Sequence, residues 1–145
     1  MSTTEAEQSA HIAAGPEACF EAIADFESYP DWQTAVKRCE VLERDEKGRG
    51  RLIETVIDAK VREVRYRLRY HFEPPHRVWW DYVEGDVHSV EGEFVFEEEG
   101  EGRTRATYRL AIDPGRFVPG PVRRLLVEGV MKGAVRDLKR RVEEG

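Results

Sequence analysis

The chain has 145 residues, of which 40% are hydrophobic and 36% are charged, and these proportions are typical of one soluble globular domain spanning 1–145. The net charge of −6 argues against a protein that binds nucleic acid or an anionic membrane surface. The sequence holds two cysteines, no signal-peptide core after Met1 and no apolar run of membrane length. We therefore expect a cytoplasmic protein without integral membrane association.

The first part of the chain predicts a strand followed by two short helices. Residues 4–13 alternate weakly between polar and apolar side chains, which is typical of a strand. Gly15 and Pro16 end this strand and begin a helix, because proline fits the first helical turn. The segment 26–32 predicts a short second helix or a turn, since Pro30 excludes a long helix through it.

The middle of the chain predicts six further strands joined by tight turns. Between residues 64 and 72, apolar side chains alternate with arginines and His71, so one face of that strand is apolar and the other is wet. Turns rich in glycine, proline and acidic residues separate the strands and are short enough for antiparallel hairpins. The expected strands are 36–44, 50–58, 61–73, 76–83, 87–97 and 103–112.

The strand expected at 61–73 carries arginines on its outer face. Residues 78–102, by contrast, hold nine carboxylates and neither lysine nor arginine. Opposite charges on neighbouring strands stabilise a sheet by about 0.2–1 kcal/mol per pair. We therefore expect structural ion pairs on a solvated face for Arg62, Arg65, Arg67 and Arg69.

A long amphipathic helix is expected from Pro121 to Glu144, after a loop at 114–121 that is rich in proline and glycine. Its apolar side chains recur at three- and four-residue steps and form one stripe. Gly129 and Gly133 lie four residues apart on this helix, and each costs about 1 kcal/mol of helix propensity relative to alanine. Either they permit a close approach of the helix to a sheet or they leave volume for a ligand, and we favour the second interpretation.

These elements predict an α+β protein in which a curved, seven-stranded antiparallel sheet wraps around the long C-terminal helix. Such a sheet leaves a concave and mainly apolar space, which is the usual site for a small molecule. Several tyrosines would share that surface, and they supply more hydroxyl groups than an apolar core requires. The alternation places these residues on the inner face: Tyr66, Leu68, Tyr70, Trp80, Tyr82, Phe94 and Tyr108.

Signs of enzyme chemistry are few. His88 falls on the predicted inner face and is the best candidate for a catalytic general acid or base, with Glu54 and Asp58 as further candidates. The adjacent Ser89 would point to the opposite face, so it cannot pair with His88 as a nucleophile. No two histidines have a metal-binding spacing, and the sequence has no Walker loop, dinucleotide fingerprint or nucleophile elbow. We therefore expect neither a metal nor a cofactor.

The order of elements and several motifs resemble the START-like, or SRPBCC, helix-grip superfamily, which contains polyketide cyclases/dehydrases, lipid-transfer domains and coenzyme Q-binding proteins. Residues 15–20 (GPEACF) and 29–32 (YPDW) are similar to its first helix and YPxW signature. Residues 92–96 (GEFVF) and 104–108 (TRATY) are similar to its GxWxF hairpin, with Phe94 where tryptophan is common. The resemblance covers nearly the whole chain and implies a cavity that binds a hydrophobic or aromatic molecule.

The resemblance and the residue pattern together give one main hypothesis and two alternatives. We expect the protein to bind, and to transport or sequester, a small hydrophobic or aromatic molecule of lipid or polyketide type. Trp32, Gly129 and Gly133 would join the inward residues as ligand contacts, and the 114–121 loop and 29–32 would frame the entrance. The first alternative is a polyketide aromatase/cyclase or dehydrase, and the second is an interaction or chaperone module with a filled core. A homodimer is compatible with all three.

Overall fold

The computed structural model describes residues 4–58, 63–113, 115 and 120–144. For residues 120–126 it describes the backbone alone. The chain begins with strand β1 (Thr4–Ile12), helix α1 (Pro16–Ala24), the 3-10 turn η1 (Phe26–Ser28) and the one-turn helix α2 (Tyr29–Trp32). The remaining strands are β2 (Val36–Arg44), β3 (Gly50–Asp58), β4 (Glu63–Glu73), β5 (Arg77–Gly85), β6 (Ser89–Gly100) and β7 (Arg103–Asp113). Helix α3 (Gly120–Glu144) closes the fold. The predicted α+β architecture is confirmed.

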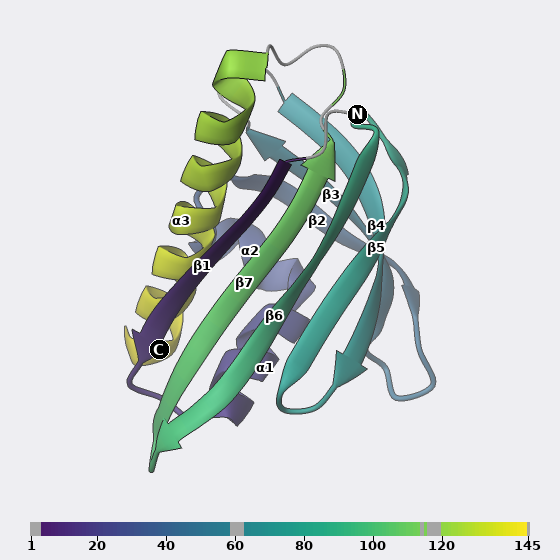
Figure 1. The fold of residues 1–145 in the computed structure, drawn as a ribbon. Coiled ribbons are helices and arrows are strands. Elements are labelled where there is room, and N and C mark those ends of the chain that lie inside the picture. The colour runs from purple at the N-terminus through teal and green to yellow at the C-terminus, as the bar shows by residue number, and fades with distance from the viewer. Residues whose placement is uncertain (1–3, 59–62, 114, 116–119, 145) are drawn as a thin grey trace.

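The strands form one antiparallel sheet with the order β1-β7-β6-β5-β4-β3-β2. The sheet curves, and α3 lies along its concave side against β1 and β7 (Figure 1). At the other edge of the concave face, η1 and α2 pack against β2. Helix α3 and the segment of η1 and α2 therefore cover the two edges of the sheet, while α1 packs against α3 and strands β5, β6 and β7.

The concave face carries the hydrophobic core. Phe20, Ile23 and Phe26 are almost completely buried on the N-terminal helices, as are Met131 and Leu138 on α3. Apolar side chains of this kind stabilise a fold by roughly 1.5–3 kcal/mol each when they are fully buried. Their packing fixes the positions of α1 and α3 relative to the sheet.

Gly92 on β6 is required by a close approach inside the sheet. A β-carbon at this position would lie 2.7 Å from Cζ2 of Trp80 and 2.8 Å from the backbone oxygen of Arg109. Such distances are shorter than ordinary van der Waals contacts, and the Arg109 backbone cannot move away cheaply. The glycine of the GEFVF segment therefore lets the Trp80 indole lie across β6.

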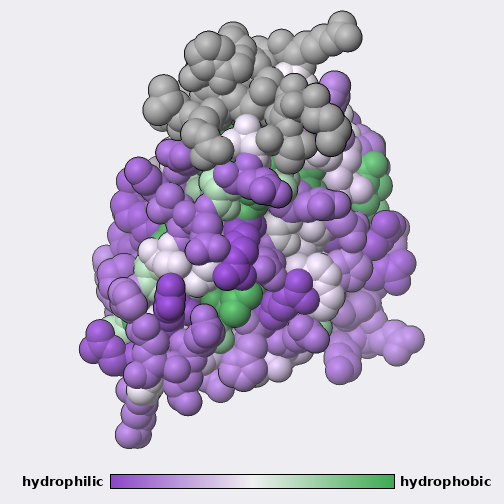
Figure 2. Space-filling model, viewed as in Figure 1, coloured by the Kyte–Doolittle hydropathy of each residue, from purple (hydrophilic) through white to green (hydrophobic). Residues whose placement is uncertain are grey.

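The convex face is solvated and carries the expected ion pairs. Arg65 contacts Glu54 at 3.1 Å and Glu84 at 2.8 Å, and Arg67 contacts Glu54 at 2.9 Å. Figure 2 shows mostly hydrophilic residues over the outer side of the sheet. The predicted pairing is confirmed for Arg65 and Arg67. Arg69 forms no ion pair with the described residues, and Arg62 lies outside them.

No helix in the described part of the chain combines the length and the apolar character needed to cross a membrane.

Candidate ligand-binding site

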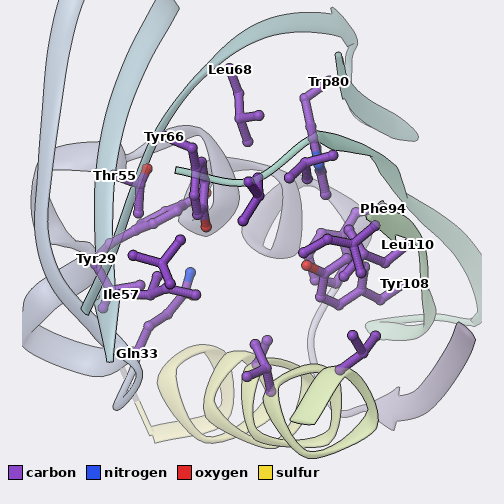
Figure 3. Close-up of a pocket in the computed structure, with 18 of the residues that line it drawn as sticks. Tyr29, Gln33, Thr55, Ile57, Tyr66, Leu68, Trp80, Phe94, Tyr108 and Leu110 are labelled. Atoms are coloured by element: carbon purple, nitrogen blue, oxygen red, sulfur yellow. The ribbon is translucent and has the colours of Figure 1, made fainter. Parts of the chain in front are cut away.

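A cavity of about 130 Å³, here called the inner chamber, lies between the concave face of the sheet and α3 (Figure 3). Strands β3 to β7, α2 and α3 all contribute to its walls. Aliphatic side chains such as Leu68, Val90 and Leu110 form much of its surface. Its aromatic residues are Tyr29, Tyr66, Tyr70, Trp80, Phe94 and Tyr108.

A second and larger space of about 450 Å³, the outer chamber, adjoins the inner one. The outer chamber is more polar, because Thr34, Asp58, Arg136 and Asp137 contribute to its walls. The residues common to both chambers form what we call the neck, and they are Gln33, Val36, Ile57, Tyr66, Tyr108, Val130 and Ala134. The inner chamber is mainly apolar, and the outer chamber, which shares these side chains with it, is more polar.

Gly129 and Gly133 line the outer chamber on α3. A β-carbon on Gly129 would meet no atom within 4 Å, and one on Gly133 would meet only Nη2 of Arg136, at 3.6 Å. Neither glycine is therefore needed for a close approach of helix to sheet. Of the two interpretations of these glycines, the structure supports the one in which they leave open volume.

Aromatic contacts hold the inner chamber in shape. The rings of Phe94 and Tyr108 stack with centroids 4.5 Å apart, and Trp80 meets Tyr108 edge to face at 5.8 Å. Tyr70 connects the same group to the helices, since its ring lies 5.4 Å from that of Trp80 and 4.6 Å from that of Phe26. Such pairs contribute about 0.5–1.5 kcal/mol beyond the burial of their area. The wall opposite α3 is therefore a connected aromatic layer.

Three tyrosine hydroxyls in the inner chamber have no hydrogen-bond partner among the described residues. They belong to Tyr66, Tyr70 and Tyr108, whereas Tyr29 donates to the backbone oxygen of Ile23 and Tyr82 to that of Val87. Figure 3 shows the hydroxyl ends of Tyr66 and Tyr108 directed into the cavity. Tyr70 is buried and the other two side chains are half-buried, and buried polar groups are normally paired, so these hydroxyls are available for a hydrogen bond with water or another molecule.

Burial keeps these tyrosines protonated. It is the main cause that raises the pKa of Tyr66, Tyr70 and Tyr108, and neighbouring tyrosines raise that of Tyr66 and Tyr70 further. A protonated hydroxyl offers one donor and can also accept. The chamber therefore presents neutral hydrogen-bonding groups on an apolar background.

Most of the predicted contact residues lie where the alternation places them. Six of the inward residues line the inner chamber, namely Tyr66, Leu68, Tyr70, Trp80, Phe94 and Tyr108. That they contact a ligand stays a prediction.

Two predicted residues do not line either chamber. Tyr82 is turned to the backbone of Val87, because the described pairing of β5 with β6 ends at Trp80 and Gly92 and the strands part beyond it. Trp32 is buried beside Tyr29, with ring centroids 5.5 Å apart, and Tyr29 lies on the side facing the cavity. The sequence-based placement of these two side chains in the cavity is wrong.

The predicted inward orientation of His88 is also wrong. Its side chain is 65% exposed, and Nδ1 lies 3.6 Å from a carboxylate oxygen of Asp113. Strand β6 begins only at Ser89, so the alternation of that strand does not extend back to His88, and Val87 is buried in its place. Of the other two candidates, Glu54 binds Arg65 and Arg67 on the convex face, and Asp58 lines the outer chamber.

Gln33, Thr55 and Ile57 line the inner chamber but were not among the predicted contacts. Gln33 follows α2 and lies four residues after Tyr29, so both fall on one face of this short helical segment. The four-residue spacing of Tyr29 and Gln33 in the sequence could therefore have predicted that Gln33 faces the cavity. Strand β3 gives no comparable signal, because its sequence has apolar side chains on both faces, with Leu52 and Val56 on one and Ile53 and Ile57 on the other.

The predicted entrance is only partly described. Residues 114 and 116–121 lie outside the part of the chain whose side chains are described, and Trp32 does not line a chamber. The outer chamber lies between the segment 33–36, the end of β3 and the glycine-bearing face of α3, and the entrance at the 114–121 loop stays a prediction. Among the described residues, no group of three or more histidine, cysteine or acidic side chains is arranged to hold a metal ion.

Comparison with known proteins agrees with this geometry. The sequence model of the family described as "Polyketide cyclase / dehydrase and lipid transport" matches residues 3–143. A START superfamily protein from Mycobacterium smegmatis has a similar structure, with a TM-score of 0.88, 22% identity and coverage of 97% of both chains. No curated protein matches the sequence.

Two further solved structures are similar. The Zhui aromatase/cyclase from Streptomyces sp. R1128 superposes with a TM-score of 0.86 at 16% identity, covering 97% of this chain and 94% of the other. The protein TTHA0849 from Thermus thermophilus superposes with a TM-score of 0.80 at 27% identity, covering 97% of this chain and 95% of the other.

Proposed function

The chain belongs to the polyketide cyclase/dehydrase and lipid transport family, and we propose that it binds a small hydrophobic or aromatic molecule in the inner chamber, for transport or sequestration. One observation carries the proposal. The chamber combines an aromatic and aliphatic lining with three tyrosine hydroxyls that have no partner among the described residues, on the buried Tyr70 and the half-buried Tyr66 and Tyr108. Ligand sites are typically apolar spaces with a few placed polar groups.

The size of the cavity limits the occupant. Typical ligand sites have volumes of roughly 300–1,000 Å³, and the inner chamber is about 130 Å³. An occupant of ordinary size would therefore extend through the neck into the outer chamber. The open cavity also speaks against a core filled by its own side chains, which is the interaction-module alternative.

The lining favours binding over acid–base catalysis. The described residues of the inner chamber include no carboxylate, imidazole, amine or thiol. Tyrosines whose pKa is raised are poor general bases near neutral pH, because almost none of the hydroxyl is ionised. The aromatase/cyclase or dehydrase alternative would therefore need an acid–base group from outside this set. The cytoplasmic location and the homodimer stay predictions.

Titration with Nile red, a neutral solvatochromic dye, tests the proposal. We expect one dye per chain, with emission typical of an apolar site, and a rise in the melting temperature as the dye concentration exceeds its Kd. Native mass spectrometry of the purified protein would identify a co-purified ligand directly.

Two leucine variants on the same helix provide the matched comparison. Ala134→Leu places the new side chain in the neck, where it should weaken dye binding, and Lys132→Leu places it on the exposed face of α3, where binding should be unchanged. Equal dye affinity in both variants, or no binding to the parent protein, would contradict the proposal.

A further inference from the structure

All polar side chains in the neck are uncharged. Gln33, Tyr66 and Tyr108 supply these groups, and they come from the end of α2, from β4 and from β7. In Figure 3 the amide of Gln33 and the hydroxyl ends of both tyrosines point into the cavity. Three elements far apart in the sequence therefore direct neutral hydrogen-bonding groups toward one region.

These groups are unsatisfied among the described residues. The side-chain amide of Gln33 makes no hydrogen bond there, although its backbone N–H donates to the oxygen of Tyr29 and its backbone oxygen accepts from Val36. The hydroxyls of Tyr66 and Tyr108 likewise have no partner. Together the three side chains offer four donors and three acceptors, which is more than a purely hydrocarbon occupant could use.

Charged groups lie farther out or on the convex face. Arg136, Asp137 and Asp58 line only the outer chamber. The carboxylate of Asp137 is already bound by Thr34 and Arg140. A carboxylate or an ammonium group placed in the neck and directed into the inner chamber would lose hydration, and no charged side chain lines that chamber to compensate, which is unfavourable. A carbonyl or hydroxyl group would meet donors and acceptors instead.

We propose that the neck binds an uncharged, oxygen-bearing group of the ligand, a carbonyl or a hydroxyl, through Tyr66, Tyr108 and Gln33, while an apolar ring system fills the inner chamber. This inference rests on the proposed function and adds the chemical class of the ligand. It also gives the ligand an orientation, because the apolar end lies toward Trp80 and Phe94 and the oxygen lies at the neck. The same geometry disfavours the binding of a fatty acid by its carboxylate at the neck.

Three naphthalene compounds of similar size separate the contributions. Naphthalene has no polar group, methyl 2-naphthyl ketone has a neutral acceptor, and 2-naphthoate carries a negative charge. Their affinities are measured by displacement of Nile red. We expect the ketone to bind roughly three- to tenfold more tightly than naphthalene, as one or two neutral hydrogen bonds would give, and the naphthoate to bind most weakly.

Phenylalanine variants assign the preference to the neck. Tyr66→Phe and Tyr108→Phe should each reduce the advantage of the ketone over naphthalene and leave the affinity for naphthalene unchanged. Tyr82→Phe is the matched control, because it removes a hydroxyl that is bound to Val87 and does not line the chamber. This control should keep the full preference, and a melting curve of each variant without ligand verifies that it is folded.

The outcomes distinguish this inference from the proposed function. If naphthalene and the ketone bind equally and the Tyr66 and Tyr108 variants change nothing, the neutral-oxygen site is wrong, whereas the hydrophobic binding function stands. If the naphthoate binds most tightly and Arg136→Gln removes that binding, the polar group is anionic and lies in the outer chamber, which also overturns the inference. If neither Nile red nor any naphthalene compound binds, the proposed function itself fails.

Discussion

Asp137 on α3 is joined to Thr34, in the segment after α2, by two hydrogen bonds to one carboxylate oxygen. Oδ2 accepts from the backbone N–H of Thr34 at 2.9 Å and from its hydroxyl at 2.6 Å. The other oxygen, Oδ1, accepts from Nη2 of Arg140 at 2.9 Å, and the Asp137 residue is 1% exposed. Both Asp137 and Thr34 line the outer chamber, so this contact connects its two walls.

Removal of the Asp137 carboxylate should therefore destabilise the fold. We expect Asp137→Ala to lower the free energy of unfolding by about 2–4 kcal/mol, because hydrogen bonds to a charged group are lost and Thr34 and Arg140 lose their partner. Thr34→Val removes only the hydroxyl and should cost less, about 1–2 kcal/mol. Urea unfolding of both variants measures the difference. Equal losses in the two variants would show that the hydrogen bonds from the Thr34 backbone and from Arg140 contribute nothing.

Substitution of Gly133 should stabilise the helix and obstruct the outer chamber. Gly133→Ala and Gly133→Leu should both raise stability by roughly 0.5–1 kcal/mol, since each removes a helix-interior glycine and the added β-carbon meets only Nη2 of Arg136, at an ordinary contact distance of 3.6 Å. Only the leucine is large enough to fill the chamber, so only it should weaken Nile red binding clearly. Thermal melts with dye titrations check both effects. A leucine variant that is destabilised by more than about 1 kcal/mol would indicate overpacking against the sheet.

Trp80 should report on the occupied chamber. It is 6% exposed and lines the inner chamber, whereas Trp79 stacks on His71 with ring centroids 5.3 Å apart and lies outside the inner chamber. A protein with Trp32→Phe and Trp79→Phe retains Trp80 alone. We expect its fluorescence to be quenched or shifted on ligand binding, with saturation at one ligand per chain. The complementary variant that lacks only Trp80 should lose most of the signal.

The carboxylates of Glu54 and Glu93 should govern acid stability. Hydrogen bonds from Arg67 and then Arg65 lower the pKa of Glu54, despite partial burial. For Glu93, burial acts in the opposite direction, but hydrogen bonds from Arg109 and Arg77 outweigh it and the net pKa is lowered. Because both pKa values are lower when folded, the stabilisation is present above the unfolded value of about 4.3 and is lost as the pH falls through the folded values.

Glutamine variants test this assignment. Glu54→Gln and Glu93→Gln should lower stability at pH 7 and flatten its decline below about pH 4.5, since the amide does not titrate there. Urea midpoints across the acid range measure the slope. Variants whose pH profiles match that of the parent protein would show that other carboxylates control the acid transition.

The sequence determined the strand faces wherever a strand is regular. On β4, successive side chains alternate without interruption, so Tyr66, Leu68 and Tyr70 all reach the inner chamber as the pattern predicts. The same periodicity placed Phe94 and Tyr108 correctly on β6 and β7. This information is local, because the backbone of a strand directs alternate side chains to opposite faces whatever the strand packs against.

Only the tertiary structure decided where the alternation stops and which elements meet. His88 precedes the start of β6, and Tyr82 follows the point where the described pairing of β5 and β6 ends, so a period of two gives the wrong position for both. Gln33 and Ala134 meet in the neck although about a hundred residues separate them along the chain. This arrangement depends on how α2 and α3 pack across the core, through side-chain volumes and contacts such as that of Asp137 with Thr34. No local sequence pattern encodes which residues of the two elements lie close together.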